Sequence, residues 1–111
     1  MVDMETFRKW ALALPDAVEM PHFDKPSFRV NKKIFATMHL KTNRAMLILS
    51  LADQSVFCAY DKEIFFPVPG FWGKHGCTLV ELKKVRKDMF KDALKTAYQN
   101  ILAAQKAKTK K

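Results

Sequence analysis

Apolar residues near the start of the chain recur at helical spacing. They share one face of a helix and are Phe7, Trp10, Ala11 and Leu14. Asp3 is a residue type that caps a helix N-terminus, and Pro15 ends the pattern. The stretch that follows, 15–25, holds two prolines and no sustained period, so we expect an irregular connection there.

Period-two alternation then predicts a β-hairpin. Strands over 27–30 and 34–40, joined by a three-residue loop, put one apolar set on a single face and Phe35 on the other. That set is Phe28, Val30, Ile34, Ala36, Met38 and Leu40. A two-residue loop would place Val30 opposite Lys33 and mix apolar with polar side chains, so we expect the three-residue loop.

The rest of the chain contributes further strands and helices. They are a strand over 44–51, a short helix capped by Asp53 or Ser50 and ending at Tyr60, an edge strand over 64–68, a strand over 77–82 and a helix over about 87–105. The inward side chains of the short helix are expected to be Ala52, Val56, Ala59 and Tyr60. We therefore predict an α+β fold, with an antiparallel sheet of about five strands and helices packed mainly on one face.

Positive charge is concentrated near the C-terminus. The 111-residue chain has a net charge of +9, and residues 83–111 hold 10 Lys and Arg against only two carboxylates. Lys87, Lys91 and Lys95 fall at i, i+4 and i+8 of the last helix and form a basic ridge. Such a field attracts polyanions. The alternative is a solvated helix face followed by a solubilising tail.

Organisation and compartment follow from simpler features. We interpret 1–105 as a single domain and 106–111 as a Lys-rich flexible tail. Cys58 and Cys77 form neither a CxxC pair nor a disulfide framework, and the acidic start of the chain does not resemble a signal peptide. A reducing, cytoplasmic location is therefore expected. No stretch approaches the roughly 20 apolar residues of a membrane span, so no membrane partner is expected.

All the glycines lie within the segment 69–77, at Gly70, Gly73 and Gly76. Glycine permits a positive φ or close approach of the backbone, so this loop should follow an unusual path. In one interpretation it is a binding loop, where Trp72 or Phe71 stacks on a base and Lys74 and His75 contact an anion. In the other it is a structural lid, whose aromatics seal one end of the core. We favour the lid for the aromatics and binding for Lys74 and His75.

Residue types used in catalysis and metal binding are scattered. His22, His39, His75, Cys58 and Cys77 lack the short ligand spacing of a zinc site. No GxSxG, HExxH or paired acidic motif occurs, and the glycine segment lacks the GxxxxGK[ST] spacing of a phosphate loop. We expect no cofactor, no metal and no catalytic residue, and a protein that is not an enzyme.

Two blocks and their order resemble the MmcQ/YjbR family. They are 28–36 (FRVNKKIFA) and 71–76 (FWGKHG), followed by a C-terminal helix that carries Tyr98. The similarity spans about 4–104. It implies a compact α+β domain with an antiparallel sheet, likened to the frataxin-like or secretion-chaperone-like folds, and a DNA-binding role.

The family pattern aromatic-Trp-x-Lys-x-x-Trp also has a counterpart in this chain. The matching positions are Phe71, Trp72, Lys74 and Cys77. Cys77 stands where the family often has Trp, so a stacking role does not carry over to that position. The Lys-rich extension after Gln105 is likewise less typical of the family.

Together these features predict a nucleic-acid-binding protein, with DNA the expected ligand, that contacts phosphates largely independently of sequence. The candidate contacts are Lys74, His75, Trp72, Arg29, Lys32, Lys33, Lys87, Lys91 and Lys95. One alternative is a protein-interaction or chaperone-like module that binds a partner segment, which predicts an exposed apolar patch. Another is a small-molecule pocket around Trp72, His75 and Met20, which predicts a deep cavity there. The nucleic-acid hypothesis requires that cations distant in sequence converge on one surface.

Overall fold

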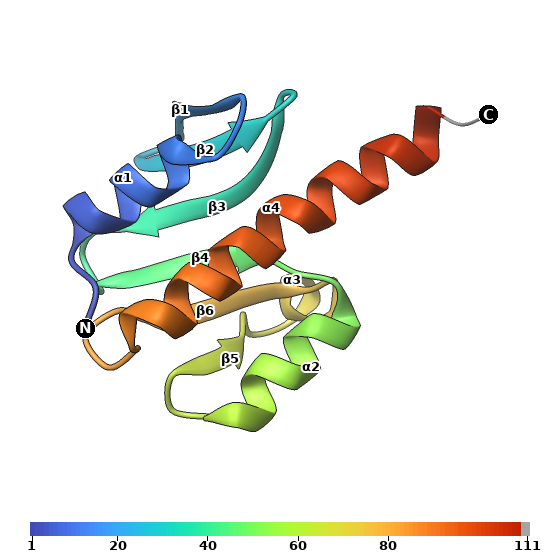
Figure 1. Ribbon diagram of the computed structural model, residues 1–111. Coiled ribbons are helices and arrows are strands. Elements are labelled where there is room, and N and C mark those ends of the chain that lie inside the picture. The colour runs from blue at the N-terminus through green and yellow to red at the C-terminus, as the bar shows by residue number, and fades with distance from the viewer. Residues whose placement is uncertain (110–111) are drawn as a thin grey trace.

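The computed structural model describes the backbone of residues 1–109 and the side chains of residues 1–105. Its elements, in chain order, are α1 (Met4–Ala13), β1 (Ala17–His22), β2 (Lys25–Val30), β3 (Lys33–His39), β4 (Arg44–Ile48), α2 (Leu51–Tyr60), β5 (Phe65–Pro67), α3 (Phe71–Lys74), β6 (Cys77–Glu81) and α4 (Lys87–Thr109) (Figure 1). The predicted tail, 106–111, lies entirely outside the described side chains, and the helical backbone of α4 continues through Thr109.

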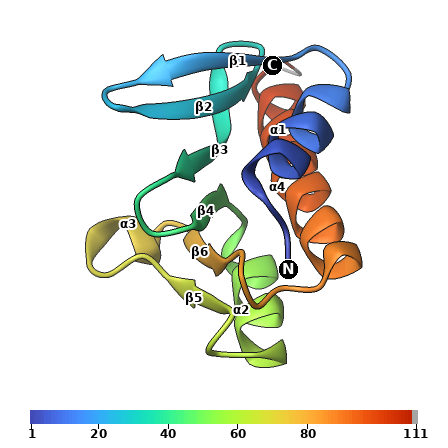
Figure 2. The ribbon, with the colours of Figure 1, turned by 90° about the vertical axis from the view of Figure 1, so that its left-hand side faces the viewer.

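In the described chain, the strands form one six-stranded antiparallel sheet in the order β1-β2-β3-β4-β6-β5. Figure 2 shows α1, α2 and α4 on one face of this sheet and the one-turn helix α3 on the other side, next to β6. The α+β prediction is confirmed, with six strands rather than five. The strand over 44–51 is β4 and is central, and β5 forms an edge, as predicted.

The core lies between the sheet and the three longer helices. In α1, Asp3 accepts a hydrogen bond from the Thr6 backbone as N-cap, and Phe7 is fully buried against Phe28 and Phe90. Burial of one Phe side chain contributes on the order of 2–3 kcal/mol. On α4, the Tyr98 hydroxyl donates to the Pro15 carbonyl at 2.6 Å. This bond fastens the end of α1 to the middle of α4.

The prediction of an irregular connection over 15–25 is wrong, because Ala17–His22 forms strand β1. The strand pairs with β2 along its whole length, from Ala17↔Val30 to His22↔Lys25. Pro21 is tolerated because β1 is an edge strand, where an amide hydrogen facing solvent is dispensable. Local proline content was thus overridden by pairing with the neighbouring strand.

The predicted loop and register of the β2–β3 hairpin are also corrected. The turn has two residues, Asn31 and Lys32, both at positive φ (50° and 72°), which is the type I′ geometry that suits strand twist. Val30 faces Lys33, the register then shifts by one residue, and Phe28 pairs with Ala36 as the three-residue loop would also require. This β-bulge turns Phe35 into the core, where its ring meets Tyr98 edge-on at 5.5 Å.

Helix α2 buries a different face from the one predicted. The predicted inward residues Ala52, Val56, Ala59 and Tyr60 are exposed, whereas Gln54 and Phe57 are buried. Phe57 packs on Phe65 of β5, with ring centroids 5.2 Å apart. The apolar pattern gave the wrong face because a glutamine is buried at the sheet edge, where its side-chain NH2 group donates hydrogen bonds that are described below.

Candidate nucleic-acid interface

The predicted basic ridge lies on the outer surface of α4. Lys87, Lys91 and Lys95 are all exposed, while Phe90 and Leu94 on the same helix are buried in the core. At a rise of 1.5 Å per residue, the ridge extends about 12 Å along the helix axis. The amphipathic pattern of the last helix therefore separates core and charge as predicted.

The ridge follows the line along which α4 packs beside α1. The Lys91 Nζ atom lies 5.4 Å from the centroid of the Trp10 ring, in a cation–π contact. One helical turn farther along α4, Lys95 borders a hollow of about 290 Å³. The hollow is lined by Trp10, Ala13, Leu14, Lys91, Leu94 and Lys95. Cations and an aromatic ring thus share one surface here.

Two more predicted contacts lie at the far end of the same helix. Lys32 and Lys33 are exposed at the turn between β2 and β3. The adjacent Asn31 side chain donates to the Gln105 side-chain oxygen at 3.0 Å, and Gln105 donates to the Val30 carbonyl at 3.2 Å. From Lys87 to Gln105 the helix axis covers about 27 Å. Five of the nine candidate residues therefore lie along α4.

Arg29 is placed elsewhere. It alternates along β2 with the buried residues Phe28 and Val30, which puts it on the sheet face away from α4. Its guanidinium donates to Ser27 Oγ at 3.2 Å and to the Pro21 carbonyl at 3.4 Å. Arg29 is therefore held on its own hairpin and does not extend the ridge.

Close backbone contacts require glycine at two positions of the glycine segment. A Cβ atom on Gly73 would lie 1.9 Å from the Val68 carbonyl oxygen. One on Gly76 would lie 1.9 Å from the Leu49 carbonyl oxygen, at a residue whose φ is +98°. The buried amide of Gln54 donates from behind to the carbonyls of Gly73 and Cys77 and to Thr78 Oγ1. The unusual path is therefore a structural requirement.

The aromatic side chains of this segment do not seal the core, so the lid interpretation is wrong for them. Phe71 and Trp72 are 64% and 63% exposed. Phe71 instead packs on its neighbours, 5.2 Å from the Trp72 ring and 4.3 Å from the His75 ring. Lys74 and His75 are exposed beside them. Figure 2 shows α3 and α4 on opposite sides of the sheet, so these residues and the ridge do not form one surface.

Carboxylates border the ridge and limit its field. The hydrogen bond from the Thr6 backbone is the main cause that lowers the pKa of Asp3, and Lys87 also favours its charged form. Farther along α4, Asp88 pairs with Arg86 at 3.3 Å, and Asp92 is exposed. These carboxylates therefore reduce the positive field along the ridge.

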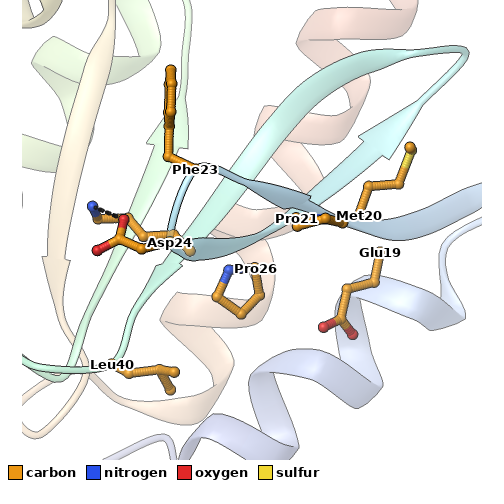
Figure 3. Close-up of a pocket in the computed structure, with 8 residues that line it drawn as sticks. Glu19, Met20, Pro21, Phe23, Asp24, Pro26 and Leu40 are labelled. Carbon is orange, nitrogen blue, oxygen red and sulfur yellow. Dashed lines mark hydrogen bonds and ion pairs between the residues drawn. The ribbon is translucent and has the colours of Figure 1, made fainter.

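A different kind of surface occurs at the β1–β2 hairpin. A hollow of about 580 Å³ is lined there by Glu19, Met20, Pro21, Phe23, Asp24, Lys25, Pro26 and Leu40 (Figure 3). Its carboxylates are already paired, Glu19 with Arg8 at 2.8 Å and Asp24 with Lys25 at 3.1 Å. Phe23 points away from Leu40 in Figure 3 and is 91% exposed, at a φ of 58° that favours glycine. Strained backbone positions cluster at functional sites, so Phe23 makes this hairpin a candidate binding surface.

The third predicted arrangement was a pocket around Trp72, His75 and Met20. These residues do not lie together in the structure. The hollow beside α3, about 490 Å³, is lined by Gln54, Pro67, Val68, Pro69, Gly70, Gly73 and Lys74. Met20 belongs to the hollow at the β1–β2 hairpin. It lies on the edge strand β1, whereas α3 contacts β5 and β6 at the other end of the sheet.

The remaining reactive groups are dispersed. Burial raises the pKa of both thiols, Cys58 and Cys77. Within residues 1–105, no three His, Cys, Asp or Glu side chains are grouped so that they could hold a metal ion. Among the helices described, none has both the length and the apolar character needed to cross a membrane.

Comparison with known proteins identifies the family. The YjbR family model matches residues 12–100, so the chain belongs to the YjbR family. The fold is similar to the crystal structure of Deinococcus radiodurans protein DR2400, which carries a DUF419 domain, with a TM-score of 0.75 and 18% sequence identity. The similarity covers 88% of this chain and 77% of that one. No curated protein matches the sequence.

Sequence reasoning missed three residues that matter at these surfaces. Trp10 was assigned only to an apolar stripe, Phe23 to an irregular segment and Gln54 to no role. Trp10 gains its importance from Lys91, 81 positions away, and no local pattern connects the two. An aromatic residue between two prolines was the one available signal for Phe23.

Proposed function

We propose that this YjbR-family protein binds nucleic acid without catalysing a reaction, through the basic ridge of α4 extended by Lys32 and Lys33. One observation carries the proposal: three exposed lysines stand in a row on a helix in the segment that holds most of the net charge of +9. Phosphates are the partners that such a row of point charges suits, because backbone contacts need charge at regular intervals and no base-specific geometry.

The dimensions support contact with several nucleotides. The distance of about 27 Å from Lys87 to Gln105 corresponds to about eight nucleotides at a rise of 3.4 Å each. If each of the three ridge lysines neutralises one phosphate, the ridge contributes about −2 for single strands and about −3 for duplex DNA to the slope of log affinity against log salt, and Lys32 and Lys33 steepen it further. Binding should accordingly be weak at physiological salt and strengthen steeply as salt is lowered.

Fluorescence anisotropy with labelled random-sequence oligonucleotides at several salt concentrations tests the proposal. Replacing Lys87, Lys91 and Lys95 with Gln should weaken binding at low salt by about tenfold or more and flatten the salt slope. A matched control replaces three lysines elsewhere: Lys41, Lys62 and Lys74. The control loses the same charge and should keep most of the affinity and the full slope.

Two results would contradict the proposal. The first is no binding by the wild-type protein even at low salt. The second is equal weakening in the two triple variants, which would mean that overall charge, rather than the ridge, attracts the oligonucleotide. Loss of binding in the control alone would move the interface to the surfaces that carry Lys41, Lys62 and Lys74, and single variants would then separate the glycine loop from the other two positions.

The exposed Phe23 favours a second candidate, a module that binds a partner protein at the β1–β2 hairpin. Apolar side chains nearby are also exposed, namely Val18, Met20 and Leu40. Phe23→Gly would remove the ring and relieve the positive φ without changing the charge. This variant should abolish association with a protein partner identified by co-purification while leaving oligonucleotide binding unchanged.

A further inference from the structure

We infer that the ridge recognises single-stranded rather than duplex nucleic acid, with one unpaired base stacked on Trp10 in the hollow between α1 and α4. The inference rests on the proposed function, because the lysines must first hold the phosphate backbone. It adds the strandedness of the ligand and a site for a base, neither of which follows from the charge of the ridge.

The hollow has the composition that a base and its phosphates require. Its volume of about 290 Å³ lies at the lower end of the range for small-molecule sites. Trp10, Leu14 and Leu94 give it apolar walls, and Lys91 and Lys95 stand at its border. A base presents a flat π-face to such a wall, while its flanking phosphates need cations within a few ångströms.

Trp10 is partly buried, and it is held between the core and Lys91. Its ring lies on Phe90, with centroids 6.4 Å apart and an interplanar angle of 28°, so the core supports one side of the indole. The Lys91 ammonium group occupies the ring at 5.4 Å and is itself exposed. Lys91 can therefore leave the ring and pair with a phosphate without any change in the backbone.

Replacing Lys91 on the Trp10 ring by a base should be favourable in free energy. Loss of an exposed cation–π contact weakens an equilibrium by about two- to fivefold. Stacking of one base on an aromatic side chain strengthens it by about five- to 150-fold. The freed ammonium group then adds a phosphate contact. An incoming base thus gains more than the displaced lysine loses.

A duplex cannot use the same site. Its bases are paired and stacked on one another, so a face becomes available only if a nucleotide is flipped out at the cost of its pairing and stacking. Duplex DNA would therefore contact only the lysines. The exposed aromatics of α3 do not replace Trp10, because Phe71 covers part of Trp72 and both lie across the sheet from the ridge.

The experiment uses the two tryptophans as separate reporters. Trp72→Phe leaves Trp10 as the one tryptophan, and Trp10→Phe leaves Trp72. Each full-length variant is titrated with an oligothymidylate of about 20 nucleotides, longer than the ~4–16 nucleotides of common single-strand sites, and with a random duplex of equal length. Tryptophan emission and the anisotropy of labelled oligonucleotide are followed together. Trp10→Leu, checked for folding by circular dichroism, removes the stacking surface.

We expect the oligothymidylate to quench the emission of Trp10 in the Trp72→Phe variant and the duplex to leave that emission unchanged. In the Trp10→Phe variant, neither oligonucleotide should change the emission of Trp72. Trp10→Leu should weaken oligothymidylate binding at least fivefold and duplex binding less than twofold, while Trp10→Phe keeps most of the affinity. If Trp10→Leu does not fold, the quenching pattern still decides the matter.

Other outcomes overturn the inference in distinguishable ways. In the first, single strand and duplex bind equally, leave the Trp10 emission unchanged and still lose affinity in the lysine variants. That result removes the base site and leaves the proposed function standing. Quenching of Trp72 instead places the base on the glycine loop. No binding of either oligonucleotide at low salt removes the inference and the proposed function together.

Discussion

The glycine loop around α3 and the ridge on α4 carry similar residue types, yet their structural origins are opposite. In the loop, three glycines and a buried glutamine fix the backbone, and the aromatic and basic side chains project from it as a consequence. On α4, the backbone is a regular helix, and the spacing of the lysines alone places them in a row. The loop is specified by its main chain and the ridge by its side chains.

This difference changes how each sequence signal should be interpreted. The clustering of glycines indicated an unusual path, and the close approaches to Val68 and Leu49 account for two of them without any ligand. Periodic lysines carry no comparable structural need, because an exposed helix face accepts almost any polar residue. A surface charge pattern that packing does not require is the better indicator of function.

The largest expected effect concerns the backbone of the loop. Gly76→Ala combines a positive φ with a contact of 1.9 Å to the Leu49 carbonyl, and should lower the free energy of unfolding by about 3 kcal/mol or more, or prevent folding. Gly70→Ala meets open space and keeps only the strain of its φ of +84°, about 1–3 kcal/mol. Urea unfolding of both variants measures the difference. Equal stabilities would mean that close packing is not what selects glycine at position 76.

A smaller effect is expected where the loop is fastened to α2. Gln54→Leu removes the donor to the Gly73 and Cys77 carbonyls and should cost about 1–3 kcal/mol of unfolding free energy. Gln99→Leu, at an exposed position of α4, should change stability by less than about 0.5 kcal/mol. Denaturant titration compares the two. A stable Gln54→Leu protein would show that the loop holds its shape without this anchor.

The smallest effect is a pH dependence on the sheet face away from the ridge. Burial lowers the pKa of His39, and the charges of Lys25 and Arg44 lower it further, whereas Asp24 opposes them. The folded state therefore binds a proton less readily than the unfolded state, and stability should fall slightly as the pH drops through about 6.5.

His39→Gln should remove that decline, as measured by thermal unfolding between about pH 7.5 and 5.5. Because His39 and the ridge lie on opposite sides of the sheet, the same substitution should leave the salt slope of oligonucleotide binding unchanged. A changed slope would indicate that the ligand contacts the sheet face as well, and the separation between the two sides would then be incomplete.

Much of the fold was predictable because its signals are local. The Asp3 cap and the stripe around Phe7 define α1, and the alternation over 77–82 defines β6. Predictions failed where a distant partner decided the outcome. β1 forms because β2 pairs with it, and Phe35 turns inward because a bulge places its ring against Tyr98. α2 buries Gln54 because three acceptors lie within hydrogen-bond distance of its side-chain NH2 group.

The candidate site divides in the same way. The sequence by itself determined that Lys87, Lys91 and Lys95 share a helix face, because helical periodicity is a property of consecutive residues. Only the tertiary structure decided that Lys32 and Lys33 lie at the far end of that helix, that Trp10 lies under Lys91 and that the glycine loop lies across the sheet. Those relations depend on how separate elements pack, and packing is set by the whole core rather than by any one segment.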